Sequence, residues 1–141
     1  MKLSTRSRYG TRMMIDMAQR YGQGAIHIGG ISERLNVSVK YLEQLIIPLK
    51  KAGYIKSVRG PKGGHMLSRP PGKISVGEIV EVLEGGICLA DCVENPEACE
   101  KAGACLTRGL WKEATRAVRE ELHSTSLGEM VKTGQKLFSE M

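Results

Sequence analysis

Four cysteines lie within 18 residues of this 141-residue chain, and the rest of the chain has none. The segment around them is rich in glycine and acidic residues and has no helical or strand periodicity. Clustered thiols in an irregular segment are usually held together by a group bound to them. We therefore expect a ligand-bearing loop between two helical segments, formed around Cys88, Cys92, Cys99 and Cys105.

The cysteine spacing is Cys88-x3-Cys92-x6-Cys99-x5-Cys105, and it leaves three chemistries open. Thiolates are the usual ligands of iron–sulfur clusters. Four thiolates also form a normal tetrahedral zinc site, although the paired two-residue gaps typical of zinc sites are absent here. The third interpretation is a set of free or redox-active thiols.

Charge is distributed very unevenly along the chain. Residues 1–73 hold 14 Lys and Arg against 3 Asp and Glu, a net charge of +11, whereas residues 74–141 have a net charge of −5. A strongly basic half indicates a polyanionic partner, although a solvated basic surface is the simpler alternative. With no run of 18 apolar residues and no secretory signal, a cytoplasmic protein that does not enter a membrane is expected. In that compartment thiols stay reduced, which favours metal binding over disulfides.

Apolar periodicity predicts a mainly α-helical chain. Gly22 and Gly24 should end the first helix, and Pro48 should kink or weaken the end of the third, at a cost of about 3 kcal/mol. Ser75 and Glu78 have the spacing of a capping box that starts the fourth helix. The predicted helices begin near residues 5, 28, 38, 75, 106 and 126, and a hairpin is predicted over 54–58 and 65–68.

A helix, a tight turn, a second helix and a hairpin with a cationic tip describe a winged helix–turn–helix. The second helix of such a pair fits the major groove of double-stranded DNA. Gln44 can pair with adenine, and Glu43 can accept from a cytosine amino group and so act as a selector. The candidate DNA contacts are Ser38, Lys40, Tyr41, Glu43 and Gln44 in the helix, Arg59 and Lys62 in the hairpin tip, and Arg8 and Tyr9 near the N-terminus.

Several motifs resemble the iron–sulfur cluster regulator (IscR) family of winged-helix transcription repressors. They occur in order along nearly the whole chain and include Tyr41-Leu42-Glu43-Gln44-Leu45, Ser57-Val58-Arg59-Gly60-Pro61 and Cys105-Leu106-Thr107. The resemblance implies a homodimer joined by its long C-terminal helices. It also implies an iron–sulfur cluster held by three cysteines, which match Cys92, Cys99 and Cys105. Some relatives have lost the cluster and sense metabolism through a partner enzyme.

The fourth ligand is where the chain departs from this family. The regulator carries a histidine three residues after its last cysteine, and here that place is Arg108, which has no lone pair to donate to a metal. Cys88 is the substitute that we predict. A ligand from the first helix of the partner subunit is one alternative, as in some relatives, although Arg8 occupies the acidic position that they use and Asp16 lies two turns further on. His123 is the other alternative. An all-thiolate set should lower the reduction potential of the cluster, and [2Fe–2S] is preferred over [4Fe–4S].

The sequence therefore predicts a DNA-binding region over residues 1–73, a linking helix and cysteine loop over 74–105, and a dimerisation helix with a C-terminal helix over 106–141. The predicted function is transcription regulation controlled by an iron–sulfur cluster, acting on iron–sulfur biogenesis or stress genes. A cluster-free or zinc-containing repressor switched by a partner protein or by thiol redox is the alternative, followed by a small electron carrier. No catalytic nucleophile–base pair or phosphate loop is recognisable, so an enzyme is not expected.

Overall fold

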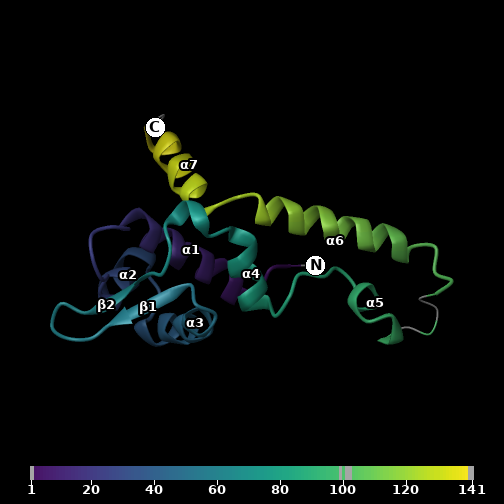
Figure 1. Ribbon diagram of the computed structural model, residues 1–141, viewed down its shortest axis with the longest axis horizontal. Helices are drawn as coiled ribbons and strands as arrows, with labels where there is room; N and C mark the ends of the chain where they lie inside the picture. The colour runs from purple at the N-terminus through teal and green to yellow at the C-terminus, as the bar shows by residue number, and fades with distance from the viewer. Residues whose placement is uncertain (1, 99, 101–102, 140–141) are drawn as a thin grey trace.

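The computed structural model describes residues 2–98, 100 and 103–139 of the chain. Helices dominate it, and the described strands are one antiparallel pair (Figure 1). The helices are α1 (Thr5–Gln19), α2 (Ile28–Leu35), α3 (Val39–Lys51), α4 (Val76–Glu84), α5 (Asp91–Glu94), α6 (Arg108–His123) and α7 (Leu127–Ser139). The strands are β1 (Ile55–Val58) and β2 (Gly64–Leu67), and short 3-10 turns cover Pro71–Lys73 and Pro96–Ala98.

Local capping residues start the helices where the sequence predicts them. The hydroxyl of Ser4 accepts from the backbone N–H of Ser7 at the start of α1, and that of Ser38 accepts from Tyr41 at the start of α3. Ser75 and Glu78 form both hydrogen bonds of a capping box at α4. Each bond satisfies a backbone donor that the first turn of a helix would otherwise leave free.

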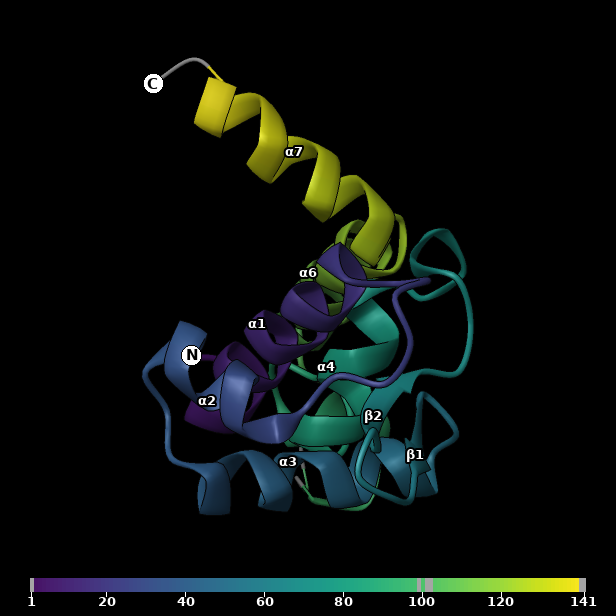
Figure 2. The ribbon, with the colours of Figure 1, turned by 90° about the vertical axis from the view of Figure 1, so that its left-hand side faces the viewer.

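An aliphatic and methionine-rich core joins the first four helices and the hairpin. Met13, Met14 and Met17 of α1 are fully buried against side chains from α3 and α4. Gly10 allows α1 to approach α4 closely, because a Cβ at this position would overlap the Leu83 side chain. The close packing of α1 on α4 is visible in the end view of Figure 2.

The structure adds detail to two parts of the predicted fold. The cysteine segment is not wholly irregular, because α5 forms one helical turn there and carries Cys92. Helix α3 continues through Pro48 to Lys51, and the N–H of Ala52 donates to the Pro48 carbonyl at 3.0 Å. The buried side chains of this helix, Leu45, Ile46 and Leu49, are at most 4% exposed and offset the cost of the proline.

Helix α6 and the cysteine segment project away from the compact α1–α4 body, and α5 lies beside the far end of α6 (Figure 1). Leu127 is fully buried and anchors α7 to the body. Among the described residues, no helix is both long enough and apolar enough to cross a membrane.

Candidate functional site

Helix α2, the turn after it and α3 form the helix–turn–helix. Asn36 ends α2 in the left-handed conformation, with φ 55°, which asparagine tolerates better than most residues. The Ser32 hydroxyl donates to the Val37 carbonyl at 2.5 Å and fixes the turn. The sequence signals for this unit were local, and the structure confirms their positions.

A buried ion pair joins this unit to α1. Asp16 is 5% exposed, and its two carboxylate oxygens each accept from Arg34 at 2.8 Å. Arg20 approaches the same carboxylate at 3.0 Å. The hydrogen bonds that Arg34 donates to Asp16 raise the pKa of Arg34. Asp16 is therefore engaged in holding α1 on α2, which argues against its role as a metal ligand.

The exposed face of α3 carries most of the predicted DNA contacts. Ser38, Lys40, Glu43 and Gln44 are all exposed. Tyr41 is only half-exposed, and its ring meets the edge of the Tyr9 ring with a centroid distance of 6.0 Å. The guanidinium of Arg12 lies 5.4 Å from the Tyr9 ring. The two tyrosines thus tie α1 to α3 and leave only part of each ring available to a partner.

The hairpin forms the predicted wing. Ile55 pairs with Leu67 and Val58 with Gly64, so the turn of residues 59–63 lies at the tip. Arg59 and Lys62 are exposed in that turn. Gly63 is required there, because a Cβ would overlap the Val58 carbonyl.

His65 anchors the wing to the body. It forms a β-bridge with Ile26, through hydrogen bonds of 2.8 and 2.9 Å, and its Nδ1 lies 2.9 Å from the Ser57 hydroxyl. Burial lowers the pKa of His65, and the positive charge of Lys50 adds to the effect. Sequence analysis missed this residue, because the bridge to Ile26 spans 39 positions of sequence.

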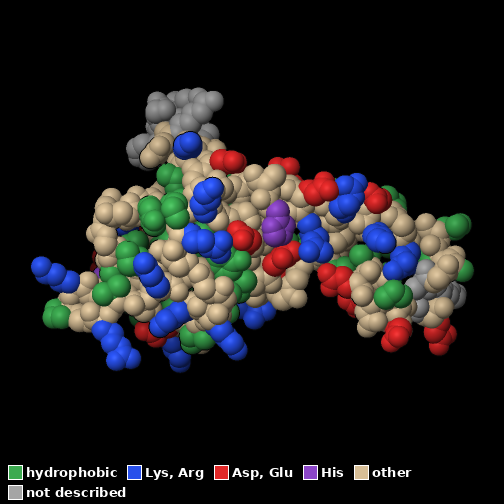
Figure 3. All heavy atoms as spheres, in the orientation of Figure 1, with side chains coloured by type: hydrophobic (Ala, Val, Ile, Leu, Met, Phe, Trp, Pro, Cys, Tyr) green, Lys and Arg blue, Asp and Glu red, His purple; other side chains and the backbone are tan. Residues whose placement is uncertain are grey.

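Lysine and arginine side chains project from the part of the surface that carries α2, α3 and the hairpin, whereas acidic side chains gather near the cysteine segment (Figure 3). Arg8 is exposed near the start of α1. The basic and acidic halves of the sequence therefore also occupy different parts of the surface. The basic part carries α3, the helix predicted to enter the major groove.

Three of the four cysteines lie among the described residues, and Cys99 lies outside them. Cys105 comes just before α6, where its Sγ is 3.1 Å from the Thr107 hydroxyl. The hydrogen bond from Thr107 and the backbone N–H groups of Thr107 and Arg108 lower the pKa of the Cys105 thiol. Such a position favours the thiolate, which is the form that binds metals.

Arg108 links two of the cysteine positions. Its Nε donates to the carbonyl of Cys92 at 2.9 Å, and it follows Cys105 by three residues. The side chain that replaces the expected histidine ligand therefore holds α5 against the start of α6. Cys92 and Cys105 are both half-buried and free of disulfide bonds.

Cys88 has a different environment. Its Sγ donates to the Ala90 carbonyl at 2.8 Å, and it lines a cavity of about 230 Å³. Lys2 and Leu3 line the same cavity from the N-terminus and Val118 from α6. Within the described ranges, no three Cys, His, Asp or Glu side chains gather closely enough to hold a metal ion.

Hydrogen bonds and ion pairs connect the cysteine segment and α6 to the body. The buried Thr115 hydroxyl of α6 accepts from the Leu89 N–H at 3.1 Å. Glu81 of α4 has a buried Oε1, 3.1 Å from Arg119 and 3.2 Å from His123, although neither contact is aligned as a hydrogen bond. His123, the weaker candidate ligand, is therefore placed beside α4.

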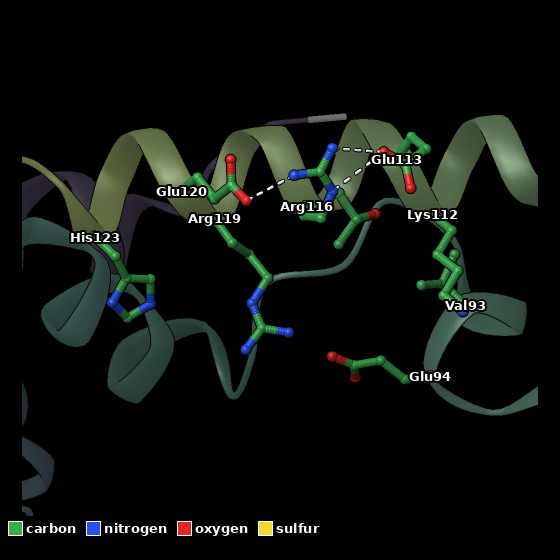
Figure 4. A pocket seen from close by; sticks show the side chains of 9 residues that line it. Val93, Glu94, Lys112, Glu113, Arg116, Arg119, Glu120 and His123 are labelled. Carbon is green, nitrogen blue, oxygen red and sulfur yellow. Dashed lines mark hydrogen bonds and ion pairs between the residues drawn. The ribbon is translucent and has the colours of Figure 1, made fainter.

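A cavity of about 570 Å³ lies between α5 and α6 (Figure 4). Arg119 and Glu94 extend into the space under α6, whereas Arg116 is held by Glu113 and Glu120 at 2.7 Å each. Both signs of charge line this cavity, and of the predicted site residues only the alternative ligand His123 lies in its lining.

Comparison with known proteins identifies the family. Residues 3–133 match Rrf2, described as an iron-dependent transcriptional regulator. The chain belongs to the Rrf2 family. Its relatives include the protein rrf2 of Nitratidesulfovibrio vulgaris, which is 42% identical over 132 residues, covering 94% of this chain and 88% of that protein. The resemblance to the IscR family is confirmed, because IscR of Xenorhabdus nematophila is 36% identical over 137 residues, or 97% of this chain and 83% of that protein.

Solved structures of the Rrf2 family confirm the fold. The cysteine regulator CymR of B. subtilis has a TM-score of 0.79 and 39% identity, covering 94% of this chain and 98% of that one. IscR of T. potens has a TM-score of 0.80 and 38% identity, covering 97% of this chain and 90% of that one. The protein is therefore a winged-helix DNA-binding transcriptional regulator of the Rrf2 family, and its relatives are regulators rather than enzymes.

Proposed function

We propose that this Rrf2-family regulator is a homodimer whose binding to DNA is controlled by an iron–sulfur cluster in the cysteine segment. The observation that carries the proposal is the hydrogen bond from Arg108 to the Cys92 carbonyl. It brings one cysteine-bearing turn to the start of the helix that follows Cys105. This contact links the chain near Cys92 to the chain near Cys105, although these two predicted ligands are 13 positions apart in sequence.

The donor set fits the chemistry of an iron–sulfur cluster. Cys92, Cys99 and Cys105 would be ligands, and the lowered pKa of Cys105 favours the required thiolate. Cys88 remains the fourth ligand that we propose, and its thiol would have to leave the Ala90 carbonyl to bind. When bound, a [2Fe–2S] or [4Fe–4S] cluster supplies sensitivity to iron supply, oxygen and nitric oxide.

The contacts around the cysteine segment explain how its order would reach the DNA-binding region. Leu89 follows Cys88 in sequence, and its backbone N–H donates to the Thr115 hydroxyl of α6. Glu84 precedes the glycine pair that leads to Cys88, and its carboxylate accepts from the Ser4 N–H at 2.8 Å. Because Ser4 caps α1, a change in the loop would act on the helix that supports α3. Sensing requires that the two loop states differ in their affinity for DNA.

Helix α6 supplies the proposed dimer interface. Its apolar residues Leu110, Trp111 and Val118 are 61%, 42% and 39% exposed. Leu106, just before the helix, is 97% exposed. A row of large apolar side chains on a projecting helix would be an unfavourable surface in a monomer, and a second copy of α6 would cover it.

A thiol-responsive regulator without a cluster is the second candidate. CymR of B. subtilis is named a global cysteine regulator and is a close structural neighbour. The observation that favours this candidate is the orientation of Cys88 toward the Ala90 carbonyl and the cavity beside the N-terminus. A structural zinc ion is the remaining alternative.

Anaerobic purification followed by visible spectroscopy and assays of iron, sulfide and zinc separates these candidates. We expect a brown wild-type protein with iron and acid-labile sulfide, and loss of both in Cys92→Ala and Cys105→Ala. Colourless protein that contains zinc, or neither metal after reconstitution, would exclude the cluster. A Cys88→Ala protein with a full and equally stable cluster would reject Cys88 as the fourth ligand and leave the other assignments intact.

A further inference from the structure

Ile47 is an apolar side chain on the exposed side of α3. It is 66% exposed, whereas the core positions Leu45 and Leu49 of the same helix are at most 1% exposed. Within the described residues, Ile47 belongs neither to the core nor to the half-buried side chains packed against it. Folding of α3 therefore does not account for an isoleucine at this position.

The position of Ile47 continues the row of predicted groove-reading residues. Lys40, Glu43 and Gln44 are exposed, and Ile47 follows at the next helical step. Residues separated by three, four and seven positions share one face of a helix. Homeodomain recognition helices use the same spacing to bring four side chains to base edges.

We propose that Ile47 contacts the 5-methyl group of a thymine in the major groove and makes thymine a preferred base in the operator. The thymine methyl is the apolar group that the major groove displays, and apolar side chains recognise it. Burial of the isoleucine against the methyl also removes the unfavourable exposure of both groups to water.

The dimensions of the helix and of DNA place this thymine relative to the base read by Gln44. Three residues of α-helix advance about 4.5 Å along the axis, against about 3.4 Å for one base-pair step. The thymine contacted by Ile47 therefore lies at the base pair next to that of Gln44, on either strand. The inference rests on DNA binding through α3, and it is independent of whether a cluster is bound.

The test removes only the methyl group. An operator is selected from a random duplex library with the full-length wild-type protein, and each of its thymines is replaced in turn by deoxyuridine. Affinities are measured by fluorescence anisotropy at one fixed salt concentration. At one thymine per half-site, the wild-type protein should lose about fourfold in affinity, the factor that corresponds to burial of one methyl group.

Three variants assign that loss to Ile47. Ile47→Ala should bind the thymine and uracil operators equally, and Ile47→Val should show an intermediate ratio. Lys40→Ala should weaken binding to both operators and keep the wild-type ratio, because its charge does not meet the methyl. Circular dichroism and size-exclusion chromatography verify that each variant is folded and keeps its oligomeric state.

Two results would overturn the proposal. One is a wild-type protein that is insensitive to uracil at every thymine. The other is an Ile47→Ala protein that keeps the wild-type preference for thymine over uracil. If that variant also changed its oligomeric state, Ile47 would belong to a contact between proteins. A colourless protein that still shows the Ile47-dependent preference would separate this inference from the cluster proposal.

Discussion

The carboxylate of Glu84, the last residue of α4, accepts a hydrogen bond from the backbone N–H of Ser4 at 2.8 Å. The Ser7 hydroxyl donates to the same oxygen at 2.5 Å. A negative charge at the N-terminus of α1 also interacts favourably with the helix dipole. The hydrogen bonds with Ser4 and Ser7 lower the pKa of Glu84 below its ordinary value of 4.5, and the contribution of Ser4 is the largest.

Replacement of Glu84 by glutamine should reduce the free energy of unfolding by about 0.5–1 kcal/mol near neutral pH, because the partly exposed carboxylate is screened by water. The folded-state pKa is lowered, so the stabilisation is present above pH 4.5 and is lost as the pH falls through the folded value. Urea unfolding of wild type and variant at several pH values measures the difference. A constant difference at all pH values would contradict the ionic cap.

Asp16 should contribute more to stability than the surface ion pairs of α6. Asp16 is 5% exposed and its carboxylate is bonded twice to Arg34, so Asp16→Ala should lower the free energy of unfolding by about 2–3 kcal/mol. Arg116→Ala is the matched control, since its pairs with Glu113 and Glu120 are solvent-exposed and should contribute little. Equal losses in the two variants, measured by urea unfolding, would refute this ranking.

The wing and α3 should contribute differently to DNA binding. Lys62→Ala should weaken binding to all sequences alike and reduce the slope of log affinity against log salt by about 1, as for a phosphate contact. Gln44→Ala should relax the preference for one adenine by about 1–3 kcal/mol and leave the salt slope nearly unchanged. Titrations of selected and scrambled duplexes at several salt concentrations check both. A Lys62→Ala variant with altered base preference would assign the wing a role in base reading.

Helix α6 should be essential for dimerisation. Trp111→Glu places a charge in the exposed apolar row and should raise the dimer dissociation constant about 30-fold, or about 2 kcal/mol. Glu113→Gln changes a charge on the same helix and should leave the dimer intact. Analytical ultracentrifugation measures both. A Trp111→Glu protein that dimerises like wild type would show that another surface forms the interface.

Local chemistry explains why the helix starts could be predicted from the sequence. Ser38, Ser75 and Glu78 act on backbone groups within three residues, so their roles can be inferred from neighbouring residues. The contacts of Glu84 with Ser4 and of Asp16 with Arg34 join residues 80 and 18 positions apart. Such pairs depend on tertiary packing, and no spacing rule identifies them.

The candidate site shows the same division between features set by nearby residues and features that depend on tertiary contacts. The exposure of Lys40 and Gln44 followed from helical periodicity. The role of Arg108 did not, because its bond to the Cys92 carbonyl forms only when α5 folds back on α6. From the sequence, Arg108 could be identified only as a residue that cannot bind metal and whose charge could offset part of the negative charge of a neighbouring cluster.

The most direct test of the central claim is the operator affinity of one protein preparation with and without its cluster. Anaerobic wild-type protein is titrated against its selected operator, stripped of iron and sulfide, and titrated again at the same salt concentration. We expect the two dissociation constants to differ by about tenfold or more, within the range of allosteric coupling energies, and the difference to disappear in Cys105→Ala. Equal affinities of the holo and stripped protein would contradict control of DNA binding by a cluster in the cysteine segment.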